Sequence, residues 1–187
     1  MNNSDVLGLL TRTQEEIAKI RQIITEAGFF SNTTPYLSKY TLIKASGTLE
    51  QAFKSIIADH CVNDANPQIN KFIDNKIRRS SMNPTYANIC TLLAQFDEQW
   101  NKNFKQSIKE HENHSKMLDA LQSLSSARNE FAHGGNPTTS INDIEEYYKY
   151  AVEVMLELDK LLCSNILEQE QEQEQEQEQE QEQEQEQ

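Results

Sequence analysis

The sequence has few turn-forming residues and few cysteines. Its 187 residues include 5 Gly and 4 Pro, too few for the many turns of an all-β protein. The three cysteines, Cys61, Cys90 and Cys163, are scattered singly, so their spacing indicates neither a disulfide framework nor a zinc ribbon. This usage is typical of a helical protein in a reducing compartment, and we expect a cytoplasmic location.

The sequence also lacks membrane and export signals. No apolar run approaches the roughly 20 residues that a membrane-spanning helix needs. Residues 1–5 have neither the basic nor the apolar region of a secretory signal. We therefore expect a chain that does not associate with membranes.

The chain as a whole has far fewer basic than acidic side chains, but the excess of acidic groups is concentrated in one segment. The net charge is -13, from 17 basic and 30 acidic side chains. Residues 168–187 alternate Glu and Gln and supply ten of the acidic groups; the rest of the chain has a net charge of -3. The charge therefore neither excludes a nucleic-acid substrate nor argues for one.

Apolar residues repeat at helical spacing along most of the chain. This periodicity predicts helices over residues 5–27, 34–62, 66–79, 83–96 and 113–133, and a last helix that begins at Ser140. Gly47 weakens the second of these helices by about 1 kcal/mol relative to Ala, so a break there is an alternative. The polar stretch around Trp100, Phe104 and Ile108 does not show where a helix would begin or end.

The first and last predicted helices have the most regular apolar stripes. In the first, the stripe is Leu7, Leu10, Ile17, Ile20, Ile24 and Ala27. In the last, it is Ile144, Tyr148, Ala151, Val152, Met155, Leu158 and Leu162. Such helices bury their stripes against one another, so the sequence predicts an all-α bundle within one domain, residues 1–167.

The Glu-Gln alternation of residues 168–187 forms a separate, acidic tail. Like charges at i and i+4 oppose a helix, and the segment has no apolar face to bury. We expect this tail to be disordered.

Polar residues of interest lie just before Gly134 and Gly135. The apolar stripe Met117, Leu121 and Leu124 leads to Arg128, at a position where a core residue is expected. A guanidinium there must form an ion pair or face a cleft or subunit interface, because a buried and unpaired charge is costly.

The residue pattern alone leaves two interpretations of this segment. An Arg on an apolar stripe is often a structural residue, either ion-paired or snorkelling with its charged end in water, and a His before a C-terminal Gly often binds the last carbonyl groups of a helix. In the other interpretation, Arg128, Asn129 and His133 form a catalytic site. Residues five apart point about 140° apart on a straight helix. A catalytic site that contains both Arg128 and His133 therefore needs a relaxed last turn or a second subunit.

The segment Arg128 to Gly134, Arg-Asn-Glu-Phe-Ala-His-Gly, resembles the Arg-x4-6-His motif of the HEPN superfamily. The leucines before the motif, the Gly pair after it and the helix from Ser140 fit the same pattern over residues 117–162. The resemblance implies a HEPN-like helical bundle with additional helices, whose motif-bearing part covers about residues 113–163.

The resemblance also implies a function. HEPN proteins are usually homodimers, and many are metal-independent ribonucleases that act as toxins of toxin–antitoxin systems or as antiviral effectors. Arg128 and His133 match their catalytic pair, and Asn129 matches the polar position beside the Arg. This implies an RNA substrate, no cofactor, and a homodimer in which two motifs face each other across a cleft. An antitoxin or defence-system partner protein is also implied, as is a 2′,3′-cyclic phosphate product.

One position departs from the family pattern. HEPN toxins that are silenced by nucleotidylation carry a Tyr two residues after the motif His, and this chain has Gly135 there. The resemblance therefore does not extend to that mode of control.

Three further patterns are weaker. Lys71, Lys76, Arg78 and Arg79 could bind an RNA backbone or form a solvated surface. His111 and His114 have helical i, i+3 spacing, but no second ligand pair accompanies them, so they do not indicate a metal site. Trp100 and the tyrosines at 147, 148 and 150 could stack on bases, although packing between helices is the more common role.

The sequence thus favours a metal-independent HEPN-type endoribonuclease. A non-catalytic HEPN-like module for dimerisation or partner binding is the alternative, and a helical adaptor whose acidic tail binds a basic partner is a third. Burial of Arg128 and His133 in ion pairs within the chain would favour the binding module. Their accessibility would favour the nuclease.

Overall fold

The bundle is built around its last helix. The computed structural model describes residues 1–29, 31–62 and 66–185, with side chains as far as Cys163. The regular elements in these residues are α1 (Ser4–Ala27), α2 (Thr34–Val62), α3 (Pro67–Ile73), the π-helical turn η1 (Asp74–Arg78), α4 (Tyr86–Phe96), α5 (Glu98–Glu110), α6 (His114–Ala132) and α7 (Ile141–Gln185). The described residues contain no strand, which confirms the predicted all-α bundle.

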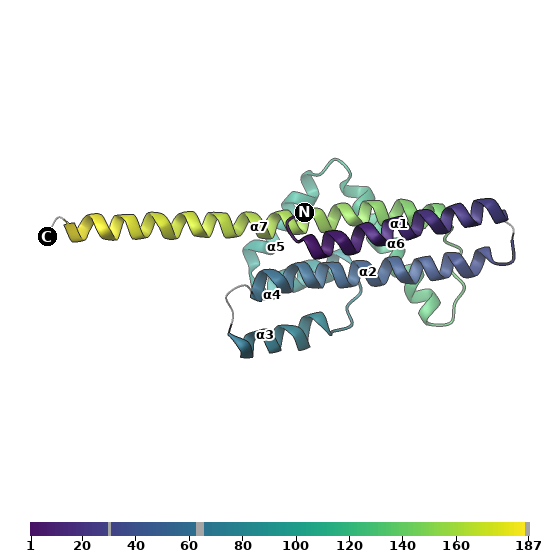
Figure 1. Cartoon of the computed structure of the whole chain (residues 1–187), viewed down its shortest axis with the longest axis horizontal. Coiled ribbons are helices and arrows are strands. Elements are labelled where there is room, and N and C mark those ends of the chain that lie inside the picture. Colours follow the sequence, from purple (N-terminus) through teal and green to yellow (C-terminus); the bar gives the residue numbers. More distant parts are fainter. Residues whose placement is uncertain (30, 63–65, 186–187) are drawn as a thin grey trace.

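Helix α7 packs against α1, α2, α5 and α6, and α2 also packs against α1 and α6. In Figure 1, α1, α2 and α7 run side by side, while α3 lies outside them next to one end of α2. The largest side chains of the core are Phe53 from α2, Phe104 from α5 and Tyr148 from α7. The Tyr148 hydroxyl donates to the Leu10 carbonyl at 3.1 Å, so the one polar atom of this buried ring is satisfied.

Helix α1 is positioned by its N-cap. The Asn3 side chain accepts the Val6 backbone N–H at 3.1 Å, which satisfies one of the free N–H groups of the first turn. The buried stripe is Val6, Leu10, Thr13, Ile17, Ile20 and Ile24. The predicted stripe was wrong at both ends, because Leu7 is 41% exposed and Ala27 faces solvent. Thr13 belongs to the stripe because its hydroxyl meets that of Thr48, at 3.0 Å.

Helix α2 continues through Gly47 without a break. Gly47 faces solvent, and no atom lies within 4 Å of the place its Cβ would occupy. The helix is held by core residues on both sides of that position, including Ala45, Leu49 and Phe53. Burying side chains of the size of Leu and Phe contributes about 1.5–3 kcal/mol each, which outweighs the low helix propensity of one glycine.

The region between α2 and α4 differs most from the predicted helices. The predicted helix over 66–79 is divided into α3 and the π-turn η1, and α4 begins at Tyr86, two residues after Pro84. Thr85 is the N-cap, and its hydroxyl accepts the Asn88 N–H at 3.2 Å. Periodicity finds the apolar residues of a helix, but the cap decides where the helix begins.

Helix α7 begins as the sequence predicts. The Ser140 hydroxyl accepts the Asp143 N–H at 3.2 Å, and the Asp143 carboxylate accepts the Ser140 N–H at 3.1 Å. These reciprocal bonds form a capping box, and they set the direction in which the chain leaves the loop after α6.

The backbone of α7 remains helical into the acidic tail, as far as Gln185, and projects beyond the bundle (Figure 1). Glu and Gln have good helix propensity and no Pro or Gly interrupts them. Isolated helix without packing is marginal in water, so disorder of residues 168–187 in solution stays a prediction. Among the described residues, no helix has the length and apolar character needed to cross a lipid bilayer.

Candidate functional site

The three motif residues lie in the last turn and a half of α6. Arg128 and Asn129 are half-buried, and His133, the C-cap residue, is exposed. The two residues that precede Arg128 on its stripe, Leu121 and Leu124, are buried, and Phe131, which follows it, is half-buried. Arg128 therefore stands where the core-facing stripe of α6 reaches the surface, as its position in the sequence predicts.

Arg128 is bonded to its neighbour and not to an acid. Its Nη1 atom donates to the Asn129 Oδ1 at 3.3 Å. Among the residues that the structure describes, no carboxylate forms an ion pair with Arg128. The interpretation of Arg128 as a structural ion-pair residue therefore has no support, and the guanidinium keeps most of its donors for another partner.

A chain of amides fixes the Asn129 side chain. Its Oδ1 also accepts the Asn83 Nδ2 at 3.1 Å. The Asn83 carbonyl in turn accepts the Asn88 Nδ2 at 2.9 Å. With its oxygen shared between Asn83 and Arg128, Asn129 orients the guanidinium. The loop before α4 and the first turn of α4 thus support the end of α6.

The asparagines at 83 and 88 were missed by the sequence analysis. Asn83 was visible only as the residue before Pro84, a helix-start signal, and nothing local links it to a residue 46 positions away. A pair of amides near a suspected catalytic segment has no signal in a single sequence, because the contact is tertiary.

The end of α6 is closed by a Schellman motif. The Gly135 N–H donates to the Glu130 carbonyl at 2.8 Å, and the Gly134 N–H donates to the Phe131 carbonyl at 3.1 Å. Gly134 has φ +84°, a left-handed conformation that glycine adopts without strain. These bonds use the terminal carbonyls of α6, so the His133 ring is not needed to satisfy them.

Gly135 is required by a close approach. A Cβ at this position would lie 2.8 Å from the Glu130 carbonyl oxygen and 2.6 Å from the Glu130 Cγ. The position at which nucleotidylated HEPN toxins carry a Tyr therefore has no room for a side chain here, which gives the departure from the family pattern a structural reason.

Replacing Gly135 with Ala should lower the free energy of unfolding by about 1–3 kcal/mol, because the added Cβ must displace the Glu130 backbone and the Schellman bonds. Gly47→Ala is the matched control; it adds a Cβ into open space within a helix and should raise the free energy of unfolding by up to about 1 kcal/mol. Urea unfolding of both variants measures the difference. Equal stability of the two variants would contradict the close approach.

The basic residues at 71–79 do not form one free cluster. The Arg78 guanidinium donates to Asp59 at 2.9 Å and to Asp74 at 3.0 Å, which ties η1 to α2. The other three, Lys71, Lys76 and Arg79, are exposed. Arg78 therefore has a structural role in the fold, and only the other three present free charge to solvent.

The aromatic candidates, Trp100 and the tyrosines at 147, 148 and 150, are engaged in packing, whereas His114 is exposed. Trp100 forms an edge-to-face pair with His60 at 4.8 Å and stacks on Phe96 at 6.3 Å, and burial lowers the pKa of His60. The His111 Nδ1 accepts the Asn113 N–H at 3.1 Å. Within the described part of the chain, no group of three or more His, Cys, Asp or Glu is placed to hold a metal ion.

The cysteines are poor nucleophiles. Burial raises the pKa of the Cys61 thiol to about 11, and burial also raises the pKa of Cys90 and of Cys163. Since the thiolate is the reactive form, none of the three is a candidate for nucleophilic catalysis.

These features define a class of protein, an all-α bundle in which one helix ends with the sequence Arg-Asn-x3-His. The imidazole of that sequence is exposed, and two glycines close the C-terminal end of the helix. The sequence profile of the family described as RiboL-PSP-HEPN matches residues 10–164, which span the bundle from α1 into α7. The chain belongs to this HEPN family. Comparison with curated proteins finds no match, and comparison with solved structures finds none either.

Proposed function

We propose that this HEPN protein is a metal-independent endoribonuclease that cleaves RNA by attack of a ribose 2′-hydroxyl on the adjacent phosphate. The observation that carries the proposal is the state of Arg128, which is half-buried at the end of an apolar stripe and has no acidic partner among the described residues. A guanidinium without an acidic partner has donors available for paired hydrogen bonds to a phosphate.

The chemistry needs only the residue types of the motif. In the cleavage step, the 2′-oxygen forms a bond to phosphorus, the bond from phosphorus to the 5′-oxygen breaks, and a 2′,3′-cyclic phosphate results. The 2′-hydroxyl loses a proton and the leaving 5′-oxygen gains one. Imidazole, with an ordinary pKa near 6.5, exchanges protons at neutral pH. The exposed ring of His133 can reach a substrate without any rearrangement of α6.

Arg128 has the complementary task. The phosphorane that forms during attack carries more negative charge than the phosphodiester, and a guanidinium fixed beforehand stabilises that additional charge. The Asn83–Asn129 amide pair supports this role, because it holds the acceptor to which Arg128 is bonded. Asn129 acts through Arg128 and is a positioning residue.

A homodimer completes the proposed site. Arg128 and His133 stand five residues apart on a helix that remains regular to Ala132, so they point about 140° apart. In a two-fold symmetric dimer the same surface of both subunits meets. Arg128 of one subunit can then lie opposite His133 of the other, so that the dimer has two composite sites, each with one guanidinium and one imidazole.

The biological setting follows from the family resemblance. We propose a toxin or an antiviral-defence effector, held inactive by a partner protein until it is needed. Lys71, Lys76 and Arg79, which are exposed, are proposed as outer contacts for the RNA phosphates.

The test is cleavage of two oligonucleotides of one sequence, one of RNA and one with 2′-O-methyl riboses, by the purified chain with EDTA present. The account predicts cleavage of the RNA only, because the methylated substrate has no 2′-nucleophile. Cleavage of both would require a water nucleophile and contradict the mechanism. If neither is cleaved by a folded dimer, across a pool of cellular RNA as well, the chain is a non-catalytic HEPN module for dimerisation or partner binding.

A further inference from the structure

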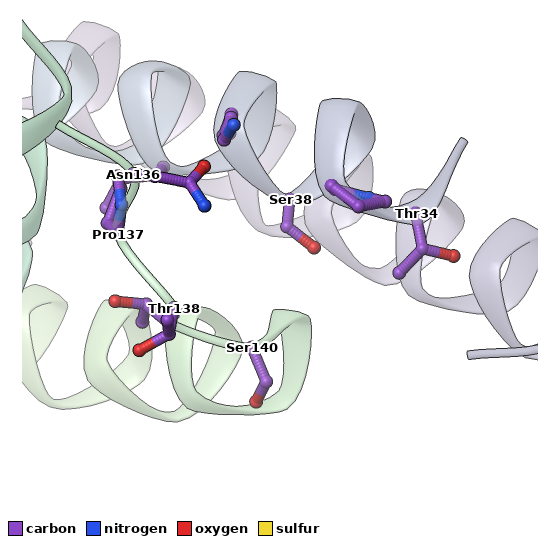
Figure 2. Close-up of a pocket in the computed structure, with 10 residues that line it drawn as sticks. Thr34, Ser38, Asn136, Pro137, Thr138 and Ser140 are labelled. Carbon is purple, nitrogen blue, oxygen red and sulfur yellow. The ribbon is translucent and has the colours of Figure 1, made fainter. Parts of the chain in front are cut away.

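A cavity opens beside the motif, between the first turns of α2 and the loop that follows α6. Its volume is about 270 Å³, and it is lined by Thr34, Pro35, Ser38, Lys39, Leu42 and residues 136–140. Figure 2 shows Asn136 extending from the loop toward α2, and the Ser38 hydroxyl directed into the space between the two segments. The cavity is slightly smaller than the usual range of ligand-binding sites, so it has room for no more than about one nucleotide.

Several polar groups of this cavity have no partner in the fold. Two of the hydroxyls are used, since Thr34 donates to the Gly28 carbonyl and Ser140 to Asp143. In the described ranges, the side chains of Ser38, Asn136 and Thr138 make no hydrogen bond. Donors and acceptors that the protein leaves unused at the wall of a cavity are suited to a polar ligand.

Lys39 supplies a positive charge and contacts a residue of the motif. Its ammonium lies 5.7 Å from the centre of the Phe131 ring, a cation–π contact. Phe131 is within the motif, two residues before His133. No carboxylate in the part of the chain that the structure describes pairs with Lys39. Its charge therefore remains available to an anion.

The wall of the cavity begins three residues after His133 in the chain. Gly134 and Gly135 follow His133 and turn the chain into Asn136, the first loop residue of the wall. Phe131 connects the same turn of α6 to the opposite wall through Lys39. A strand whose scissile phosphate lies at His133 therefore has its neighbouring nucleotide next to this cavity.

We propose that the cavity is a subsite for one ribonucleotide adjacent to the scissile phosphate of a single-stranded RNA. Lys39 binds the phosphate of that nucleotide. The amide of Asn136 and the hydroxyls of Ser38 and Thr138 bind its sugar or base edge, and Pro35, Pro137 and Leu42 cover its apolar surface. Sequence-selective RNA binding relies on single-stranded nucleotides held in this way. The proposal rests on the ribonuclease function and gives it a substrate class.

The test separates binding from cleavage. The protein is the ¹⁵N-labelled full chain carrying His133→Ala, and the probes are the four nucleoside 5′-monophosphates, uridine and inorganic phosphate. We expect at least one nucleotide to shift the backbone amide signals of Ser38, Lys39 and Thr138, and to do so at lower concentration than uridine or phosphate. Adding Lys39→Gln should weaken the binding of that nucleotide about tenfold, the usual size of one lost charge-assisted contact.

Lys44→Gln is the matched control. Lys44 lies on the same helix, five residues further along, and its ammonium is 3.5 Å from Glu16 on α1. It should bind the nucleotide as the His133→Ala parent does. A further variant, Ser38→Leu, fills the cavity and should abolish the nucleotide-induced shifts of Lys39 and Thr138.

The outcomes distinguish the two proposals. If no nucleotide shifts the cavity amides, or if Lys39→Gln and Lys44→Gln bind equally well, the subsite is wrong even when the wild-type chain cleaves RNA. If nucleotides bind here and the wild-type chain leaves every RNA intact, the ribonuclease function is wrong and the nucleotide site stands.

Discussion

Replacing Arg128 with Ala should lower the rate of RNA cleavage by about 10²–10³-fold, the size of effect seen when one fixed donor to a developing negative charge is removed. The guanidinium is half-buried and bonded to Asn129 at 3.3 Å. The variant loses this weak bond within the fold, and it loses the cation that faces the phosphorane. The loss should appear mainly in kcat, since the extra charge exists only in the transition state.

Arg128→Lys separates charge from geometry. A lysine keeps the positive charge but not the planar pair of donors, so the rate should lie between those of the wild type and the Ala variant. Arg12→Ala is the matched control, since Arg12 is exposed on α1 and takes no part in the site. Circular dichroism and the dimer mass establish that all three variants are folded. A wild-type rate in Arg128→Ala would contradict the assignment of this residue.

The second large effect concerns the shared site. The Arg128→Ala homodimer and the His133→Ala homodimer should each be nearly inactive, with a loss of about 10²–10⁴-fold when the imidazole is removed. A heterodimer of one Arg128→Ala chain and one His133→Ala chain should be active. In a heterodimer, one of the two composite sites has both wild-type side chains and the other has neither. The heterodimer should therefore recover about half of the wild-type rate.

Co-expression with two different affinity tags and purification over both isolates the heterodimer. A doubly substituted Arg128→Ala/His133→Ala chain paired with wild type is the control. It should be nearly inactive, because each of its composite sites lacks one of the two side chains. An inactive Arg128→Ala and His133→Ala heterodimer would place the whole site within one subunit and contradict the proposed geometry.

Much of the fold follows from local sequence signals. The helix predicted over residues 5–27 is α1 (Ser4–Ala27), and the capping pattern at Ser140 and Asp143 is present at the start of α7. Apolar periodicity and cap residues act over a few positions, so one sequence contains them. The predicted stripe was wrong at Leu7 because Val6, four residues before Leu10, lies on the buried face in its place.

The site was predictable only where it is continuous in sequence. Arg128, Asn129 and His133 lie within one turn and a half of helix, and a motif describes them. The residues that contact this segment come from elsewhere in the chain. Asn83, from the loop before α4, bonds Asn129, and Lys39, from α2, contacts Phe131. Arg78 shows the same limit. In the sequence it cannot be distinguished from the basic residues beside it, because its partner Asp59 lies on α2.

The measurement that tests the central claim most directly is the mass of the RNA ends made by the wild-type chain in EDTA, with His133→Ala treated in parallel. Attack by the 2′-hydroxyl leaves a 2′,3′-cyclic phosphate on one fragment and a free 5′-hydroxyl on the other. The account predicts these two ends from the wild type and intact RNA from the variant. Fragments with a 5′-phosphate and a 3′-hydroxyl, or the same ends from both proteins, would contradict it.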